Sequence, residues 1–195
     1  MESLFSFLPP ELYSTVYNSV IIIFCFITCF SYSLSQGSIV LKDKADAPRF
    51  NIYLLGQGTE HDNLERLIND NGLNDTIHLL GFDRNPYKYI SRMDLFVCSS
   101  HREGYSTATS EAVALGVPVL TTNCSGMDEI LEDGKYGLIV ENTDDALYQG
   151  LEQLVCNPDE IARYKEILKE RPRVTTLSLV AEYEKLFDTM LASAN

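Results

Sequence analysis

The sequence predicts an α/β fold in which helices cover both faces of a parallel β-sheet. Three observations support this fold class. Short apolar runs with almost no polar alternation recur along residues 50–140, as is typical of strands buried on both faces. Segments with apolar residues at helical spacing separate these runs, which indicates strands joined by helical crossovers. Glycine or proline stands at many of the junctions, where turns are expected.

The expected elements follow one another in chain order. The first are a strand at 50–55, a helix around 64–68, a strand at 77–80, a short helix at 86–93 and a strand at 95–98. They are followed by a helix at 107–115, a strand at 117–121, a short helix at 127–131 and a strand at 137–140. Long helical patterns at 144–155, 158–169 and about 176–191 complete the chain.

Residues 1–37 differ in composition from residues 38–195 and are treated as a separate apolar segment. No Lys or Arg precedes Lys42, and residues 12–34 are long enough to span a bilayer as a helix. The basic residues that follow would then keep the C-terminal side in the cytoplasm. A buried strand or helix, or a segment without native structure, are the alternatives, because the dense apolar core is short for a membrane span.

Charge and cysteine content exclude several classes of protein. With 28 acidic and 15 basic residues, the formal net charge is −13, which argues against a nucleic-acid partner. The five cysteines are odd in number and form no Cys-x-x-Cys pair, so reduced thiols are expected. The three histidines are far apart in sequence, and no metal is expected.

Ligands of a parallel α/β sheet bind outside the carboxyl ends of its strands. Gly56 and Gly58 follow one strand, where glycines let a backbone approach a ligand. The third glycine of a dinucleotide fingerprint is replaced by His61, so that cofactor site is disfavoured. A plain tight turn is the alternative. A further glycine turn at 123–126 leads into the next expected helix.

The loop at 99–106 leads directly into the expected helix at 107. Glu111 lies one turn beyond Thr107 on the same helix face, and Glu103 lies in the loop before it. The amides of Ser106 and Thr107 would open the helix, where a phosphate is favoured. Carboxylates that accept hydrogen bonds from hydroxyls, next to amides that donate to a phosphate, suit a sugar nucleotide. The alternative is a capping Ser106 with two solvated glutamates.

These motifs resemble the family 4 glycosyltransferases. The segment 103–119, in which seven residues separate two glutamates, is similar to the signature of that family. Other segments agree in order and spacing: 54–58, 80–82, 85–87, 94–97, 125–130 and 133–137. The resemblance runs from about residue 38 to the C-terminus. It implies the donor-binding half of a GT-B fold, with a Rossmann-like sheet, and retaining transfer of a sugar from a nucleotide donor to a glycan or glycolipid acceptor without a metal cofactor.

The resemblance also implies roles for individual residues. Glu103 would meet the donor sugar hydroxyls as the catalytic residue, and Glu111 the ribose hydroxyls. The remaining donor-binding residues are backbone positions or neighbours of these two: Gly104, Tyr105, Ser106, Thr107, Gly56, Gly58, Gly81 and Phe82. Of these, Gly81 and Phe82 would lie near the base. Tyr105 and Ser106 depart mildly from the family pattern, which usually has Phe and then Gly or Pro.

The acceptor domain of the family would precede this chain, and the cations that neutralise the diphosphate have no counterpart before Lys42. The interpretation is a truncated, rearranged or frame-shifted glycosyltransferase, or a domain that works with a separate chain supplying the N-terminal half. Weak or absent sugar transfer by the chain alone is therefore expected. The alternative function is a non-catalytic subunit that binds a nucleotide sugar or a partner protein. The expected location is the cytoplasm, with or without an anchor on the cytoplasmic face of a membrane.

Overall fold

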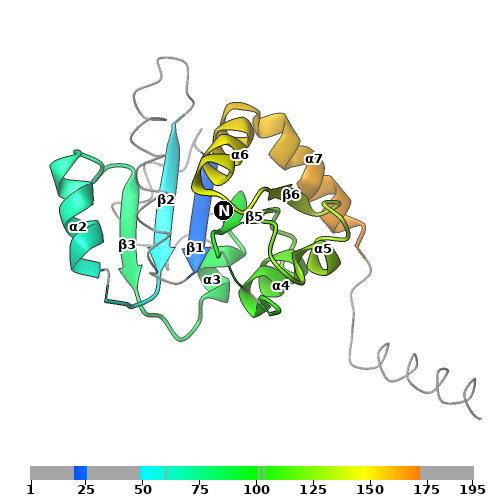
Figure 1. Cartoon of the computed structure of the whole chain (residues 1–195), viewed down its shortest axis with the longest axis horizontal. Coiled ribbons are helices and arrows are strands. Elements are labelled where there is room, and N and C mark those ends of the chain that lie inside the picture. Colours follow the sequence, from blue (N-terminus) through cyan, green and yellow to red (C-terminus); the bar gives the residue numbers. More distant parts are fainter. Residues whose placement is uncertain (1–19, 26–48, 60, 101, 103, 172–195) are drawn as a thin grey trace, which may run out of the picture.

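The computed structural model describes residues 20–25, 49–59, 61–100, 102 and 104–171. Within them, strands form one sheet with the order β3-β2-β1-β4-β5-β6 (Figure 1). The strands are β1 (Val20–Cys25), β2 (Phe50–Leu55), β3 (Ile77–Gly81), β4 (Leu95–Cys98), β5 (Val119–Thr122) and β6 (Gly137–Val140). Every neighbouring pair is parallel. The predicted parallel α/β fold is confirmed.

The helices lie between the strands and after the last of them. They are α2 (His61–Asp70), α3 (Tyr87–Ile90), α4 (Thr107–Ala114), α5 (Met127–Ile130), α6 (Asp144–Cys156) and α7 (Pro158–Lys169). Capping side chains and helix-starting residues set several of these bounds: the Thr143 hydroxyl accepts the Ala146 amide at the start of α6, and Pro158 begins α7. The helix expected at 176–191 lies outside the described residues.

The strand expected at 117–121 is displaced toward the C-terminus. Val117 and Pro118 precede β5 and are buried, so the apolar run in the sequence begins two residues before the strand does. The Pro118 carbonyl accepts the Phe96 amide, but proline has no amide hydrogen to continue the ladder.

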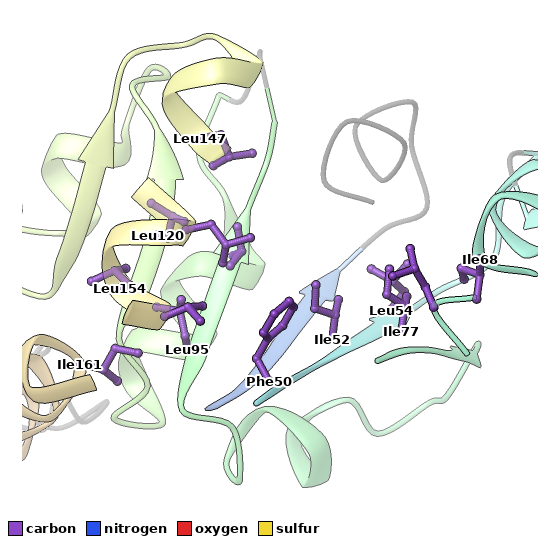
Figure 2. Packing of buried hydrophobic residues seen from close by; sticks show 14 of the residues in the cluster. Phe50, Ile52, Leu54, Ile68, Ile77, Leu95, Leu120, Leu147, Leu154 and Ile161 are labelled. Carbon is purple, nitrogen blue, oxygen red and sulfur yellow. The ribbon is translucent and has the colours of Figure 1, made fainter. Parts of the chain in front are cut away.

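Helices cover both faces of the sheet. On one face, α2, α6 and α7 pack against side chains of β2, β3, β4 and β5. Figure 2 shows part of this cluster, with Leu147 and Leu154 of α6 beside Leu120 and Leu95 of two neighbouring strands. On the other face, α3, α4 and α5 bury the alternate residues, such as Tyr53 and Phe96. Strands buried on both faces explain why the apolar runs show little polar alternation.

Strand β1 comes from the apolar N-terminal segment. It lies between β2 and β4, where Ile22 is in register with both Ile52 and Leu95. A continuous membrane helix across residues 12–34 is therefore wrong for residues 20–25, and the strand alternative holds there. An apolar sequence suits either interpretation, because the interior of a covered sheet and the interior of a bilayer both exclude water.

The boundary placed between residues 37 and 38 stays a prediction, although the sheet takes β1 from its N-terminal side. The other residues of segment 1–37 lie outside the described residues. Across the part of the chain that the structure describes, no helix is both long and apolar enough to cross a membrane.

Candidate functional site

The predicted site residues gather at the carboxyl edge of the sheet. Because all strands run in parallel, the loops after β2, β3, β4 and β5 leave from this one edge. The loops after β2, β3 and β4, the last residue of β3 and helix α4 carry the predicted donor-binding residues Gly56, Gly58, Gly81, Phe82, Gly104, Tyr105, Ser106, Thr107 and Glu111. Glu103 lies outside the described residues, so its predicted position in the site stays a prediction.

The loops after β2 and β3 are joined through two glycines. The Gly56 amide donates to the Gly81 carbonyl over 2.8 Å, and the strand register shifts at this point. Gly56 has a φ of 136° and Gly81 a φ of 68°, in the region that favours glycine. The tight-turn alternative therefore accounts for Gly56, and for Gly58 it stays a prediction. Gly58 and Phe82 are exposed at the same edge.

Helix α4 begins at the carboxyl edge with Ser106 as its N-cap. The buried Ser106 hydroxyl accepts from the Thr109 amide at 3.3 Å and from the Thr109 hydroxyl at 2.9 Å. The capping alternative is confirmed for Ser106. The amides of Thr107 and Ala108 come before this capped amide in the first turn, where an α-helix leaves its amides without intrahelical partners. The cap and an anion-binding helix start are therefore compatible.

Glu111 is held by a residue that was not among the predicted site residues. The Tyr87 hydroxyl, at the start of α3, donates to Glu111 Oε1 over 3.0 Å. This hydrogen bond is the main cause that raises the pKa of Tyr87, because the neighbouring carboxylate favours the protonated phenol. Glu111 is only partly buried and its bond to Tyr87 lies at the exposed surface, so the solvated-glutamate alternative stays open beside the ligand-binding role. The sequence signal for Tyr87 was its place in the segment 85–87, after a strand end.

The loop between β3 and α3 is fixed by the Asp83 carboxylate. It accepts from the Asn85 amide over 2.9 Å and from the Tyr89 hydroxyl over 3.1 Å, and it forms an ion pair with Lys88 at 2.6 Å. The hydrogen bond from Lys88 is the largest cause that lowers the pKa of Asp83, and the same bond raises the pKa of Lys88. These contacts hold the chain between Phe82 and Tyr87.

Acidification is expected to loosen this loop. A carboxyl whose pKa is lowered in the folded state stabilises that state fully at pH values above its ordinary pKa of about 4. This stabilisation is lost as the pH falls through the lower pKa of the folded state. In an NMR titration toward pH 2, the Asn85 amide should therefore show a transition that is absent in Asp83→Asn. The Val119 amide, which donates to the Tyr136 carbonyl and has no carboxyl group within two residues of it in sequence, is the control. The same Asn85 transition in both proteins would contradict the role of Asp83.

The loop after β5 packs directly on the loop before α4. Gly126 has a φ of 82°, and a Cβ placed on it would lie 2.8 Å from the Gly104 carbonyl oxygen. Only a glycine fits this close approach without displacing the backbone. On the same side, the Cys124 thiol donates to the Ser100 carbonyl over 2.7 Å. The glycine turn at 123–126 thus supports the loop that carries Gly104 and Tyr105.

Comparisons with known proteins agree with this arrangement. The model of the family Glycosyl transferases group 1 matches residues 38–171. An N-acetylgalactosamine-N,N'-diacetylbacillosaminyl-diphospho-undecaprenol 4-alpha-N-acetylgalactosaminyltransferase of Campylobacter jejuni is 34% identical over 124 residues, which are 63% of this chain and 34% of that protein. The chain spans about a third of the length of the curated relatives it matches.

Solved structures show the same fold. A glycosyltransferase from Rickettsia africae superposes with a TM-score of 0.68 and 19% identity, over 97% of this chain and 55% of that chain. The pneumococcal O-GlcNAc transferase GtfA, in complex with UDP and GlcNAc, superposes with a TM-score of 0.66 and 17% identity, over 88% of this chain and 36% of that chain. These likenesses show the fold of GT-B glycosyltransferases. Together with the family match, they establish that the chain belongs to the group 1 family of glycosyltransferases.

Proposed function

We propose that this chain is the donor-binding half of a retaining glycosyltransferase, which transfers a sugar from a nucleotide donor to a glycan or glycolipid acceptor. The observation that carries the proposal is the arrangement of α4. One helix brings its first amides and the held carboxylate of Glu111 to the carboxyl edge of the sheet. Amides suit a diphosphate and a carboxylate suits hydroxyls, and a nucleotide sugar offers both.

The proposed roles follow from the chemistry of each group. The amides of Thr107 and Ala108 and the positive end of the helix dipole would stabilise the negative charge of the diphosphate, which increases as the sugar departs. Glu111 would accept hydrogen bonds from the ribose hydroxyls, and Glu103 from the hydroxyls of the transferred sugar. Gly81 and Phe82, in the adjoining loop, would contact the base.

The relatives support the classes of donor and acceptor. The pneumococcal structure contains UDP and GlcNAc, a nucleoside diphosphate and a sugar. The Campylobacter jejuni relative is named for an acceptor sugar linked to undecaprenol diphosphate, which is a glycolipid. The identity of the base, the sugar and the acceptor is to be found by testing a panel of each.

A non-catalytic subunit is the second candidate function. The described residues form the sheet of one half, whereas a GT-B enzyme reacts in the cleft between two halves. In this case a separate chain would supply the other half. Co-purification of such a chain that carries a GT-B acceptor domain would support this candidate.

We propose that the chain acts in the cytoplasm and without a metal. The cysteines of the described residues, Cys98, Cys124 and Cys156, are free thiols, which suits a reducing compartment.

The potential metal ligands that the described part brings together, His61, Asp62 and Glu65, lie on the partly or fully exposed start of α2, where acidic groups are common without an ion. Nucleotide affinity is therefore expected to be the same with EDTA as with added Mg²⁺ or Mn²⁺.

The 195-residue polypeptide is expected to bind nucleotides but to transfer sugar weakly or not at all. Calorimetry with UDP and GDP tests binding. Incubation with a panel of nucleotide sugars and glycolipid acceptors tests transfer, and the anomeric configuration of any product, read by NMR, tests retention. No binding of any nucleoside diphosphate would contradict the proposed function. Robust turnover by this polypeptide, abolished in Glu103→Ala, would contradict the expected weak transfer.

A further inference from the structure

Tyr87 and Glu111 connect two elements that are far apart in sequence. Tyr87 is the first residue of α3, and Glu111 lies in α4, whose start faces the carboxyl edge of the sheet. The 3.0 Å hydrogen bond between the Tyr87 hydroxyl and Glu111 Oε1 joins them. We propose that Tyr87 is a positioning residue of the donor site, whose hydroxyl holds the Glu111 carboxylate in the orientation that accepts the ribose hydroxyls. This inference rests on the proposed function.

The position of Tyr87 is itself fixed from several sides. Pro86 precedes it with the fixed φ that suits a helix start, and Ile90 anchors the same helical turn in the core with no exposed surface. Asp83 ties down the loop before it through the contacts with Asn85, Lys88 and Tyr89. The phenol is therefore attached to a rigid support, although 45% of Tyr87 is exposed.

Glu111 benefits from being held because its free side chain has several rotatable bonds. Ordering such a side chain when a ligand binds costs conformational entropy, and a side chain that is ordered beforehand lowers this cost. Tyr87 is the hydrogen-bond partner that the structure gives to Glu111 among the described residues. Its removal should leave Glu111 free to turn toward water.

The hydrogen bond from Tyr87 leaves room for the ribose. An ionised carboxylate has about four acceptor positions on its two oxygens. The tyrosine hydroxyl occupies one, so two ribose hydroxyls can be accepted at the others without displacing it. The raised pKa of Tyr87 also keeps this hydroxyl protonated, and so a donor, at neutral pH. Positioning should consequently outweigh any competition for the carboxylate.

The test compares ribonucleotides with their 2′,3′-dideoxy analogues. UDP, GDP and the two dideoxy analogues are titrated by calorimetry into the full chain and into Tyr87→Phe, Glu111→Gln and the double variant. We expect Tyr87→Phe to bind the ribonucleotides about five- to tenfold more weakly, because the Glu111 side chain must then be ordered when the nucleotide binds. The affinity for the dideoxy analogues should be unchanged. In the Glu111→Gln background, the tyrosine substitution should cause a smaller loss than in the wild-type chain, because the amide oxygen of glutamine accepts the tyrosine hydrogen bond more weakly than a carboxylate does.

Tyr136→Phe is the matched control. Its hydroxyl donates to Glu132 Oε1 over 2.8 Å, so the same substitution removes the same kind of hydrogen bond beside α5. The ratio of ribonucleotide to dideoxynucleotide affinity should stay at the wild-type value in this variant. A change in this ratio that equals that of Tyr87→Phe would overturn the inference.

The outcomes separate the two proposals. If the wild-type chain binds no nucleotide, the proposed function fails and this inference fails with it. If the wild-type chain binds, Glu111→Gln weakens binding and Tyr87→Phe does not, only the inference fails. A loss in Tyr87→Phe that is equal for ribonucleotides and dideoxynucleotides would also overturn it, because the effect would then not act through the ribose.

Discussion

Gly137→Ala is expected to destabilise the chain by about 3 kcal/mol, the upper part of the range for overpacked interiors. Gly137 is the first residue of β6 and lies opposite Val119 of β5. A Cβ on Gly137 would lie 1.9 Å from the carbonyl oxygen of Val119, and its other nearest atoms are also backbone. No side chain can rotate to relieve this contact, so β6 must move away from β5.

The displacement of β6 should spread to the helix above it. On α6, a Cβ at Gly150 would meet the ends of Leu120, Val140 and Leu138 within 3.4 Å, so this helix lies close to both strands. A shift of β6 therefore opens a packed layer as well as strand hydrogen bonds. Since small domains are stable by only about 5–15 kcal/mol, the loss should be large enough to shift the unfolding transition clearly.

Urea-induced unfolding followed by far-ultraviolet circular dichroism measures this effect. Gly104→Ala is the matched control, because a Cβ at Gly104 meets nothing within 4 Å. Its free energy of unfolding should stay within about 0.5 kcal/mol of the wild-type value. Equal stability of Gly137→Ala and the wild-type chain would contradict the close pairing of β5 and β6 at this position.

The strands from residue 50 onward could be predicted because their apolar composition indicates that both faces of each strand are buried. Segments such as Phe50–Leu55 and Leu95–Cys98 are apolar apart from Asn51 and end at turn or loop residues, so their strand type and bounds follow from local sequence. Val20–Cys25 has the same composition without such flanks. A local pattern cannot distinguish a central strand from the middle of a membrane helix, and pairing with β2 and β4 decides it.

The candidate site could be predicted only as far as local chain geometry defines it. Ser106 at the start of α4 and Glu111 on the same helix follow from spacing along the helix. The contact between Tyr87 and Glu111 depends on how α3 and α4 pack against neighbouring strands, and no spacing rule covers residues this far apart. The close approach of Gly126 to Gly104 is likewise a tertiary contact.

Glu111→Ala should weaken the binding of both the bare nucleoside diphosphate and the complete nucleotide sugar by about 1–3 kcal/mol, or roughly 5- to 150-fold. Both ligands carry the ribose, so both lose the same charged hydrogen bonds. Glu103→Ala should weaken the binding of the nucleotide sugar by a similar amount and leave the binding of the bare nucleotide almost unchanged, because the proposed partners of Glu103 are the sugar hydroxyls. Calorimetry with UDP, GDP and their sugar derivatives measures both effects.

Glu166→Ala, on the exposed side of α7, is the control for loss of a negative charge from this acidic chain. Glu166 pairs with Lys169 on its own helix, and its removal should change neither affinity. A general gain in anion affinity after removal of any carboxylate would appear in this control. It would act against the expected losses, so it cannot produce them. If Glu103→Ala and Glu111→Ala each lose the same affinity for both ligands, the separate roles are contradicted. A shared effect on folding or on the loop would then explain these losses without any contact to sugar or ribose.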